Sequence, residues 1–223
     1  MSKSQVPRAK AVSDMRSVRT LMLSSVALAL LSCASPYQVV KLPEREADLY
    51  PLSQTRAEIT IAIDEITSAE RGERYFGANL IREGILPLSV VVSNYGAHRV
   101  IMKPSDILVH RGAEIIDPLP IETVIATAKN QHWSLRSKTE KQVESYFKGL
   151  AFQETILMHA ETYQGVIFLP IPRPRNSSDA LFTMLSLFGD SRLKVQVGVR
   201  DLDADNRLRF GPFTLSLPED TRD

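Results

Sequence analysis

The sequence predicts a mainly β protein, an antiparallel β-sandwich that carries an inserted helical pair and a short helix before a C-terminal hairpin. Three observations predict this class. About eight short segments alternate apolar and polar residues with the period of a half-buried strand. Turn residues separate these segments, without the regular strand-helix alternation of a parallel sheet. The stretch from about residue 120 to residue 150 interrupts the strands with a helical period.

The first strands are predicted between residues 58 and 116. In the segment 58–64, isoleucines alternate with smaller or polar residues. The segment 85–94 is rich in β-branched residues and predicts a central strand that begins at Pro87, because proline lacks the N–H that a ladder needs. Short strands follow at 99–103, 106–110 and 114–116, the last two joined by a hairpin turn.

Two amphipathic helices are predicted in the insert. The first has apolar residues at helical spacing from residue 121 to residue 128, directly after Pro120. The second begins at a capping box of Ser137 and Glu140, and its apolar stripe continues to Leu150. Both helices are expected to lie on a sheet or over its open end.

Strand periodicity returns after Phe152 and predicts strands at 154–159 and 163–169. Alternating prolines at 170, 172 and 174 then take the chain out of the sheet, and a short helix is predicted at 180–188. The C-terminal hairpin joins 193–200 to 208–217 through a polar loop, and both arms alternate.

One of these strands carries a family resemblance. The run from Gly84 to Asn94 is similar to the second-strand pattern of immunoglobulin-like domains found in bacterial exported lipoproteins. The resemblance implies an immunoglobulin-like β-sandwich. It describes architecture and not ancestry, because the disulfide and core tryptophan of antibody domains are missing and the sole tryptophan, Trp133, lies in the helical insert.

The first 33 residues predict export. A basic lead at 16–19 precedes an apolar run at 21–31, which is too short to span a bilayer as a stable helix and is typical of a signal peptide over 1–32. A start at Met15 would give a more compact signal. Leu30-Leu31-Ser32-Cys33 resembles the lipobox of bacterial lipoproteins, in which signal peptidase II cuts before the cysteine and the new N-terminus carries acyl chains.

The lipobox resemblance implies that Cys33 is the lipid attachment site and would incorporate palmitate. In that family an aspartate directly after the cysteine tends to retain the protein in the inner membrane. Here that residue is Ala34, so the resemblance implies the outer membrane of the cell envelope, with the protein facing the periplasm. The alternative is an ordinary secretory signal in which the cysteine stands by chance.

A tether is predicted between the anchor and the domain. Residues 33–56 contain Pro36, Pro43 and Pro51 among charged residues and show no sustained period. Fully extended, such a tether would reach about 65 Å. The alternative is that part of it, such as 37–40, adds a strand to the sheet. The β-sandwich domain is expected over 57–218.

The composition after the signal argues against one class of partner. Residues 33–223 hold 22 Lys and Arg against 25 Asp and Glu, once the five basic residues and one acidic residue of 1–32 are removed. This slightly acidic balance and the absence of recognition motifs argue against binding to nucleic acid. With Cys33 acylated, no cysteine is left for a disulfide, so the fold must depend on a hydrophobic core.

The sequence predicts no catalytic residue and no cofactor. It contains no Gly-x-Ser-x-Gly elbow, no glycine-rich phosphate loop and no HExxH motif, and its four histidines are scattered. The alternating carboxylates of Asp201, Asp203 and Asp205 are a weak calcium candidate, since the glycine and glutamate of a complete EF-hand loop are absent. The alternative is a solvated hairpin tip.

Two classes of function follow. The first is a lipid-anchored binding or scaffolding protein with a protein partner in the cell envelope. The second is a cell-envelope hydrolase whose site is assembled from scattered Asp, Glu and His residues. A docking site is predicted at the short helix, where Phe182 and Leu187 lie outside the apolar stripe and Arg173 and Arg175 could meet an acidic partner or lipid headgroups. The alternative is that this helix plugs the sandwich and is buried all round.

Overall fold

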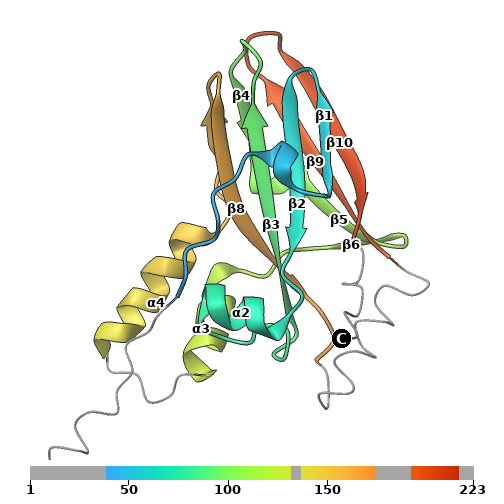
Figure 1. Ribbon diagram of the computed structural model, residues 1–223. Coiled ribbons are helices and arrows are strands. Elements are labelled where there is room, and N and C mark those ends of the chain that lie inside the picture. The colour runs from blue at the N-terminus through green and yellow to red at the C-terminus, as the bar shows by residue number, and fades with distance from the viewer. Residues whose placement is uncertain (1–38, 132–136, 174–191, 216–223) are drawn as a thin grey trace, which may run out of the picture. The chain divides into compact units, whose positions relative to one another are not determined.

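The computed structural model describes residues 39–131, 137–173 and 192–215, and Figure 1 shows how their elements are arranged. These residues belong to one compact unit, Tyr37–Asp223. They form two antiparallel sheets and three α-helices, so the prediction of a mainly β protein is confirmed.

The first sheet has four strands in the order β1-β2-β3-β8. These strands span Ser53–Arg56, Ile59–Glu65, Ile85–Asn94 and Glu161–Pro170. All ten residues of β3 are buried. This burial arises because the second sheet covers one face of β3, while helices and the segment before β1 cover the other.

The second sheet is built around β9, Leu193–Asp201. One side of β9 pairs with β10, Asn206–Thr214, which confirms the predicted C-terminal hairpin. The other side pairs with two strands in turn, β5 and then β4. These two strands are β4, Val100–Met102, and β5, Ile107–Arg111. At the edges of the sheet, β6, Glu114–Ile116, pairs with β5, and β7, Thr155–Leu157, pairs with β4.

The two sheets share a hydrophobic core, as the alternating isoleucines and valines predict. Ile61 and Ile63 of β2 lie in one cluster with Val195, Val197 and Val199 of β9. Each of these side chains is no more than 1% exposed. The predicted inward faces of both strands are therefore confirmed.

The position of Pro87 differs from the prediction. The strand begins at Ile85, so this proline lies inside β3 and not at its start. The Pro87 carbonyl accepts a hydrogen bond from Ile66 N–H at 3.0 Å, and the nitrogen of the same residue faces the same side. β2 has already ended at Glu65 on that side, so the missing N–H of Pro87 breaks no ladder bond.

The three α-helices are α2 (Ala69–Phe76), α3 (Ile121–Gln131) and α4 (Ser137–Leu150). Two short 3₁₀ turns occur, η1 (Ala47–Leu49) and η2 (Pro104–Asp106). α3 and α4 confirm the predicted helical pair, while the side chain of Ser137 lies outside the described residues. α2 was not predicted from the sequence. Ser68 Oγ caps its first turn by accepting from Arg71 N–H, and Gly77 closes it at a φ of 62°.

The predicted tether is wrong for the part that precedes β1. Ala47 and Tyr50 pack on Ala62 and Val91 on the outer face of the first sheet, and Ala47 is fully buried. β1, inside the same predicted tether, pairs with β2. The apolar outer positions of the sheet need a cover, and this irregular segment supplies it without any sequence period. The alternative, that part of this segment adds a strand to the sheet, holds for Ser53–Arg56 and not for Val39 and Val40, which lie in no strand.

Candidate functional site

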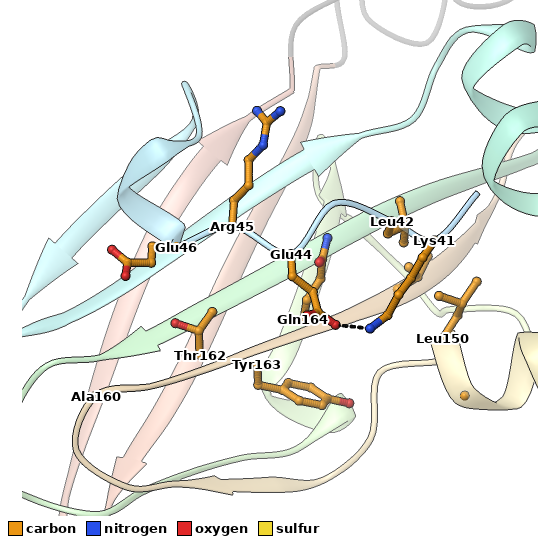
Figure 2. Close-up of a pocket in the computed structure, with 12 residues that line it drawn as sticks. Lys41, Leu42, Glu44, Arg45, Glu46, Leu150, Ala160, Thr162, Tyr163 and Gln164 are labelled. Carbon is orange, nitrogen blue, oxygen red and sulfur yellow. Dashed lines mark hydrogen bonds and ion pairs between the residues drawn. The ribbon is translucent and has the colours of Figure 1, made fainter.

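A groove beside β8 is the candidate site, and Figure 2 shows the side chains that line it. Its volume is ≈ 610 Å³, within the size range of ligand pockets. Three parts of the chain form its walls: the segment before η1, the first half of β8, and the end of α4. The lining residues are Lys41, Leu42, Glu44, Arg45, Glu46, Gly149, Leu150, Ala160, Thr162, Tyr163, Gln164 and Val166.

The N-terminal wall of the groove is held in place at several points. Leu42 is 5% exposed and packs among the helices. Val40 N–H donates to Arg74 O at 2.9 Å, and Ala47 N–H donates to Ser93 Oγ at 3.0 Å. Tyr50 Oη donates to Pro43 O at 3.3 Å. These contacts fix residues 40–50 against the domain, so they form a stable wall of the groove.

The charges on this wall differ in their partners. Lys41 forms an ion pair with Glu44, which the dashed line in Figure 2 marks. Glu46 accepts a hydrogen bond from Tyr95 Oη at 3.0 Å. Arg45 forms no ion pair within the described part of the chain. Both carboxylates of the groove are thus engaged, and Arg45 is a cation available to a ligand.

The other wall is the outer edge of β8, which is the last strand of its sheet. In an antiparallel strand, the N–H and C=O groups of successive residues point to opposite sides, so those of every second residue point to the same side. Val166 O accepts from Phe152 N–H on the side away from β3, so Thr162 and Gln164, which have the same parity, also direct their backbone groups away from β3.

Only half of this edge is covered. Val166 O accepts from Phe152 N–H at 2.9 Å, and Phe168 O accepts from Leu119 N–H at 2.7 Å. Within the described residues, no backbone hydrogen bond reaches Thr162 or Gln164 on the outer side. Exposed strand edges of this kind are ready to pair with another chain. The uncovered half of β8 is also the half that lines the groove.

A polar cluster lies under the groove on the outer face of the first sheet. Gln164 Nε2 donates to the buried Ser89 Oγ at 2.8 Å, and Arg71 Nη2 donates to Asp64 Oδ2 at 2.6 Å. Burial raises the pKa of the Tyr50 hydroxyl, and the negative charge of Asp64 raises it further. Gln164 is thus hydrogen-bonded to Ser89, and Arg71 to Asp64. These bonds fix the side chains beneath the groove and use their hydrogen-bonding groups.

The three carboxylates of the weak calcium candidate face different partners in the structure. Asp203 Oδ1 accepts from Arg99 Nη2 at 2.7 Å, and Asp205 Oδ1 accepts from Arg200 Nη2 at 2.7 Å. Asp201 Oδ2 lies 2.9 Å from His98 Nδ1. Among the described residues, no group of three metal-ligating side chains is found.

Most of the other predicted site residues lie outside the described residues: Cys33, Arg175, Phe182 and Leu187. Arg173 is described, and it is exposed with its Nε donating to Glu83 O at 3.1 Å. Of the described histidines, His159 has Nδ1 3.1 Å from Gly96 O, and His98 has Nδ1 2.9 Å from Asp201 Oδ2.

Sequence reasoning did not find the groove. The strand at 163–169 was predicted, but nothing in its residues shows that it stands at the end of a sheet. The one available signal is that Thr162 and Gln164 place polar side chains on one face of an otherwise apolar strand.

Comparison with known proteins adds structural neighbours only. No protein-family model and no curated protein matches the chain. The chain is similar to the structure of the candidate lipoprotein ycdA from Bacillus subtilis, with 9% identity and a TM-score of 0.37, covering 75% of this chain but 38% of that one. It is also similar to the yjhA protein from Bacillus subtilis, with 10% identity and a TM-score of 0.36, covering 70% and 93%. Likeness at this level establishes neither a shared family nor a shared function.

Within the ranges that the structure describes, no helix has the length and apolar character needed to cross a membrane.

Proposed function

We propose that this chain is a lipid-anchored binding protein of a bacterial cell envelope, which holds an extended segment of a protein partner against the free edge of β8. The anchor is Cys33, within the lipobox-like sequence that ends the apolar run. The domain is an immunoglobulin-like sandwich, and its placement is the outer membrane, facing the periplasm. The observation that carries the binding role is the uncovered edge at Thr162 and Gln164 inside a groove.

The groove has the dimensions of a site for one added strand. From Ala160 to Val166 there are six residue steps, so the groove runs roughly 20 Å along β8. This is about the length of a common β-strand of five to six residues. Addition of a partner strand to a sheet edge obtains affinity from backbone hydrogen bonds and specificity from alternate side chains. The unpaired backbone groups of Thr162 and Gln164 would supply the first of these.

The charge of the groove favours an acidic residue in the bound segment. Arg45 has no ion-pair partner within the described residues, whereas Lys41 is paired with Glu44. A carboxylate on the partner would form an ion pair with Arg45 at the mouth of the groove. The hydrolase alternative has less support here, because Glu44 and Glu46 already bind Lys41 and Tyr95.

The test is a selection of extended peptides from a displayed library on residues 34–223, followed by edge-blocking variants. Thr162→Pro removes a backbone donor that faces the groove and leaves the ladder with β3 intact. It also removes the 2.8 Å hydrogen bond between the Thr162 and Ser93 hydroxyls, so we expect loss of peptide binding with a moderate fall in melting temperature and retained folding. Ile115→Pro is the matched control. Ile115 pairs only with His110 and lies next to the pair that closes a two-residue turn, so its N–H also faces outward, but on β6.

The expected result is binding that Thr162→Pro abolishes and Ile115→Pro leaves intact. Peptides that bind equally well to both variants would show that the edge of β8 is not used.

The docking role of Phe182 and Leu187, with Arg173 and Arg175, stays a prediction. The double variant Phe182→Ser with Leu187→Ser tests it. Loss of partner or vesicle binding at an unchanged melting temperature would support docking, whereas a collapse of stability would place both side chains in the core.

A further inference from the structure

The outer faces of the two sheets differ in what packs on them. The outer face of the first sheet is covered, since Ile85, Val166 and Phe168 pack against the helices and Ala62 and Val91 pack under η1. On the outer face of the second sheet, no described α-helix packs, and among the described elements the 3₁₀ turn η2 approaches β9, with Asp106 beside Gly198. The exposed positions of β9 alternate with its core residues and face outward.

The register of the strands shows which residues share this outer face. Ile156 of β7, Ile101 of β4, Arg200 of β9 and Arg207 of β10 lie opposite one another in one continuous row across four strands. A second row contains Ile115, His110, Lys194 and Thr214. In both rows the apolar residues lie toward β6 and β7, and basic residues lie on β9 or β10.

No carboxylate occupies an outward position in the strands of this face. Its exposed cations are Lys194, Arg200, Arg207 and Arg209. Arg200 pairs with Asp205, and Arg207 pairs with Asp106, and both carboxylates lie outside the strands. Lys194 and Arg209 form no ion pair within the described residues. The face therefore carries a net positive charge, although residues 33–223 carry three more acidic than basic residues.

Large apolar side chains lie exposed beside these cations. Leu108 is 40% exposed, Ile115 is 54% exposed and Ile156 is 52% exposed. An exposed surface that combines cations with large apolar side chains is the composition of elements that lie on a membrane, where cations meet headgroups and apolar residues enter the boundary of the acyl chains.

We propose that the outer face of the second sheet, here called the basic face, docks on a bilayer surface that contains anionic phospholipids. The occupant is a membrane and not a second copy of the chain, because two copies would oppose the same cations across a self-complementary interface. Docking by this face would also direct the groove, which lies on the outer side of the first sheet, away from the membrane and toward a partner. The inference goes beyond the binding groove and needs neither the groove nor Cys33.

The test uses residues 34–223, which contain the whole compact unit, sedimented with vesicles. One set of vesicles contains phosphatidylglycerol and phosphatidylcholine, and the other contains phosphatidylcholine alone. Binding to the anionic vesicles should exceed binding to the neutral ones and should be lost at about 0.5 M salt, where charges are screened within a few ångströms. Lys194→Glu with Arg209→Glu breaks no described ion pair and should weaken binding at least about tenfold, since each basic residue near an anionic surface contributes substantially.

The matched control is Arg82→Glu with Lys141→Glu, which changes the net charge equally at exposed positions away from the basic face. This control should keep most of the binding. Ile156→Ser should weaken binding severalfold with an unchanged melting temperature. Equal binding to neutral vesicles, or equal loss in the control, would overturn the proposal. Self-association that Lys194→Glu with Arg209→Glu removes, without vesicle binding by the parent chain, would assign the face to a second copy and would also overturn it.

Discussion

Asp201 shows how one carboxylate can organise a turn. Its Oδ1 accepts from the N–H groups of Asp203 and Ala204 at 2.9 and 2.8 Å, and its Oδ2 meets His98. Aspartate often bonds to backbone amides two or three residues further on, which closes a tight turn. The hydrogen bond from Ala204 N–H lowers the pKa of Asp201, and the nearby His98 lowers it further. The alternating aspartates therefore fasten the β9–β10 turn to the segment before β4.

The His98 and Asp201 pair predicts a pH dependence of stability. The hydrogen bond and charge of Asp201 raise the pKa of His98 in the folded protein above its ordinary value of 6.5. The pair therefore stabilises the fold fully below pH 6.5, and this stabilisation is lost as the pH rises through the pKa of His98 in the folded protein. The lowered pKa values of Asp201 and of Asp203, the latter to about 2, give contributions that are lost only in strong acid. His98→Gln should therefore lower the melting temperature more at about pH 5.5 than at about pH 8.5. An equal effect at both pH values would contradict the role of the pair.

Ile61 and Val197 test the shared core from both sheets. Ile61 is fully buried and Val197 is 1% exposed, so truncation of either leaves a cavity between the sheets. Ile61→Ala should cost about 2–4 kcal/mol of unfolding free energy, and Val197→Ala somewhat less. Urea denaturation measures both. Losses near zero would mean that the two sheets do not pack through these residues.

At the scale of elements, β8 is the strand that connects fold and site. The outer edge of its C-terminal half accepts backbone hydrogen bonds from Phe152 and Leu119, and its N-terminal half lines the groove. Gly165 permits this arrangement, because a Cβ there would lie 2.7 Å from Phe152 Cα, closer than real contacts allow. The absence of a side chain at Gly165 thus lets the chain after α4 close the edge of β8.

Gly165→Ala should therefore destabilise the protein by about 1–3 kcal/mol through overpacking against Phe152. Denaturant unfolding measures this loss. Gly149→Ala is the control, since a Cβ at Gly149, in the last turn of α4, meets nothing within 4 Å and should be neutral or stabilise by up to about 1 kcal/mol. Similar losses in both variants would show that contact with Phe152 is not the cause.

The sequence predicted elements well where side chains repeat with the period of the backbone. The alternation of Leu193, Val195, Val197 and Val199 predicted β9 and its buried face. α2 was missed because its eight residues bury only Gly72 and Phe76, too few to show a helical period. The segment before β1 was missed because an irregular cover has no period at all.

The candidate site was less predictable than the fold. The groove depends on which strand ends a sheet, and that depends on pairings between distant segments, such as β3 with β8. The partners of the three aspartates show a related limit. Arg200, which pairs with Asp205, lies in the hairpin itself, but His98 and Arg99, which pair with Asp201 and Asp203, come from the distant segment before β4.

For the whole molecule, the two sheets divide the proposed tasks. Among the described residues, the first sheet has a covered outer face and a groove beside its edge strand β8, and no α-helix covers the basic face of the second. With Cys33 acylated and the basic face on the bilayer, the groove would face a partner. The shortened tether fits this arrangement, because residues 42–56 are packed on the domain and are not available as a spacer.

The anchor predicts a chemical modification that can be measured in cells. The protein should incorporate radioactive palmitate, and Cys33→Ala should remove the label and leave an unprocessed precursor or a soluble form. One acyl chain gives marginal membrane binding, whereas several chains hold a protein effectively permanently. Ser32→Ala, which keeps a small residue before the cysteine, should retain the label. An unlabelled parent protein would contradict the lipoprotein assignment.

The most direct measurement of the binding role is residue-resolved amide hydrogen exchange along β8, in the free protein and with a selected peptide bound. In the free protein we expect exchange rates that alternate from one residue to the next: the amides of Thr162 and Gln164 exchange fast, and those of Tyr163 and Gly165, which face β3, exchange slowly. Bound peptide should protect Thr162 and Gln164 and leave the other two unchanged. Slow exchange at Thr162 and Gln164 in the free protein, or no added protection on binding, would contradict the claim that β8 offers a free edge to a partner strand.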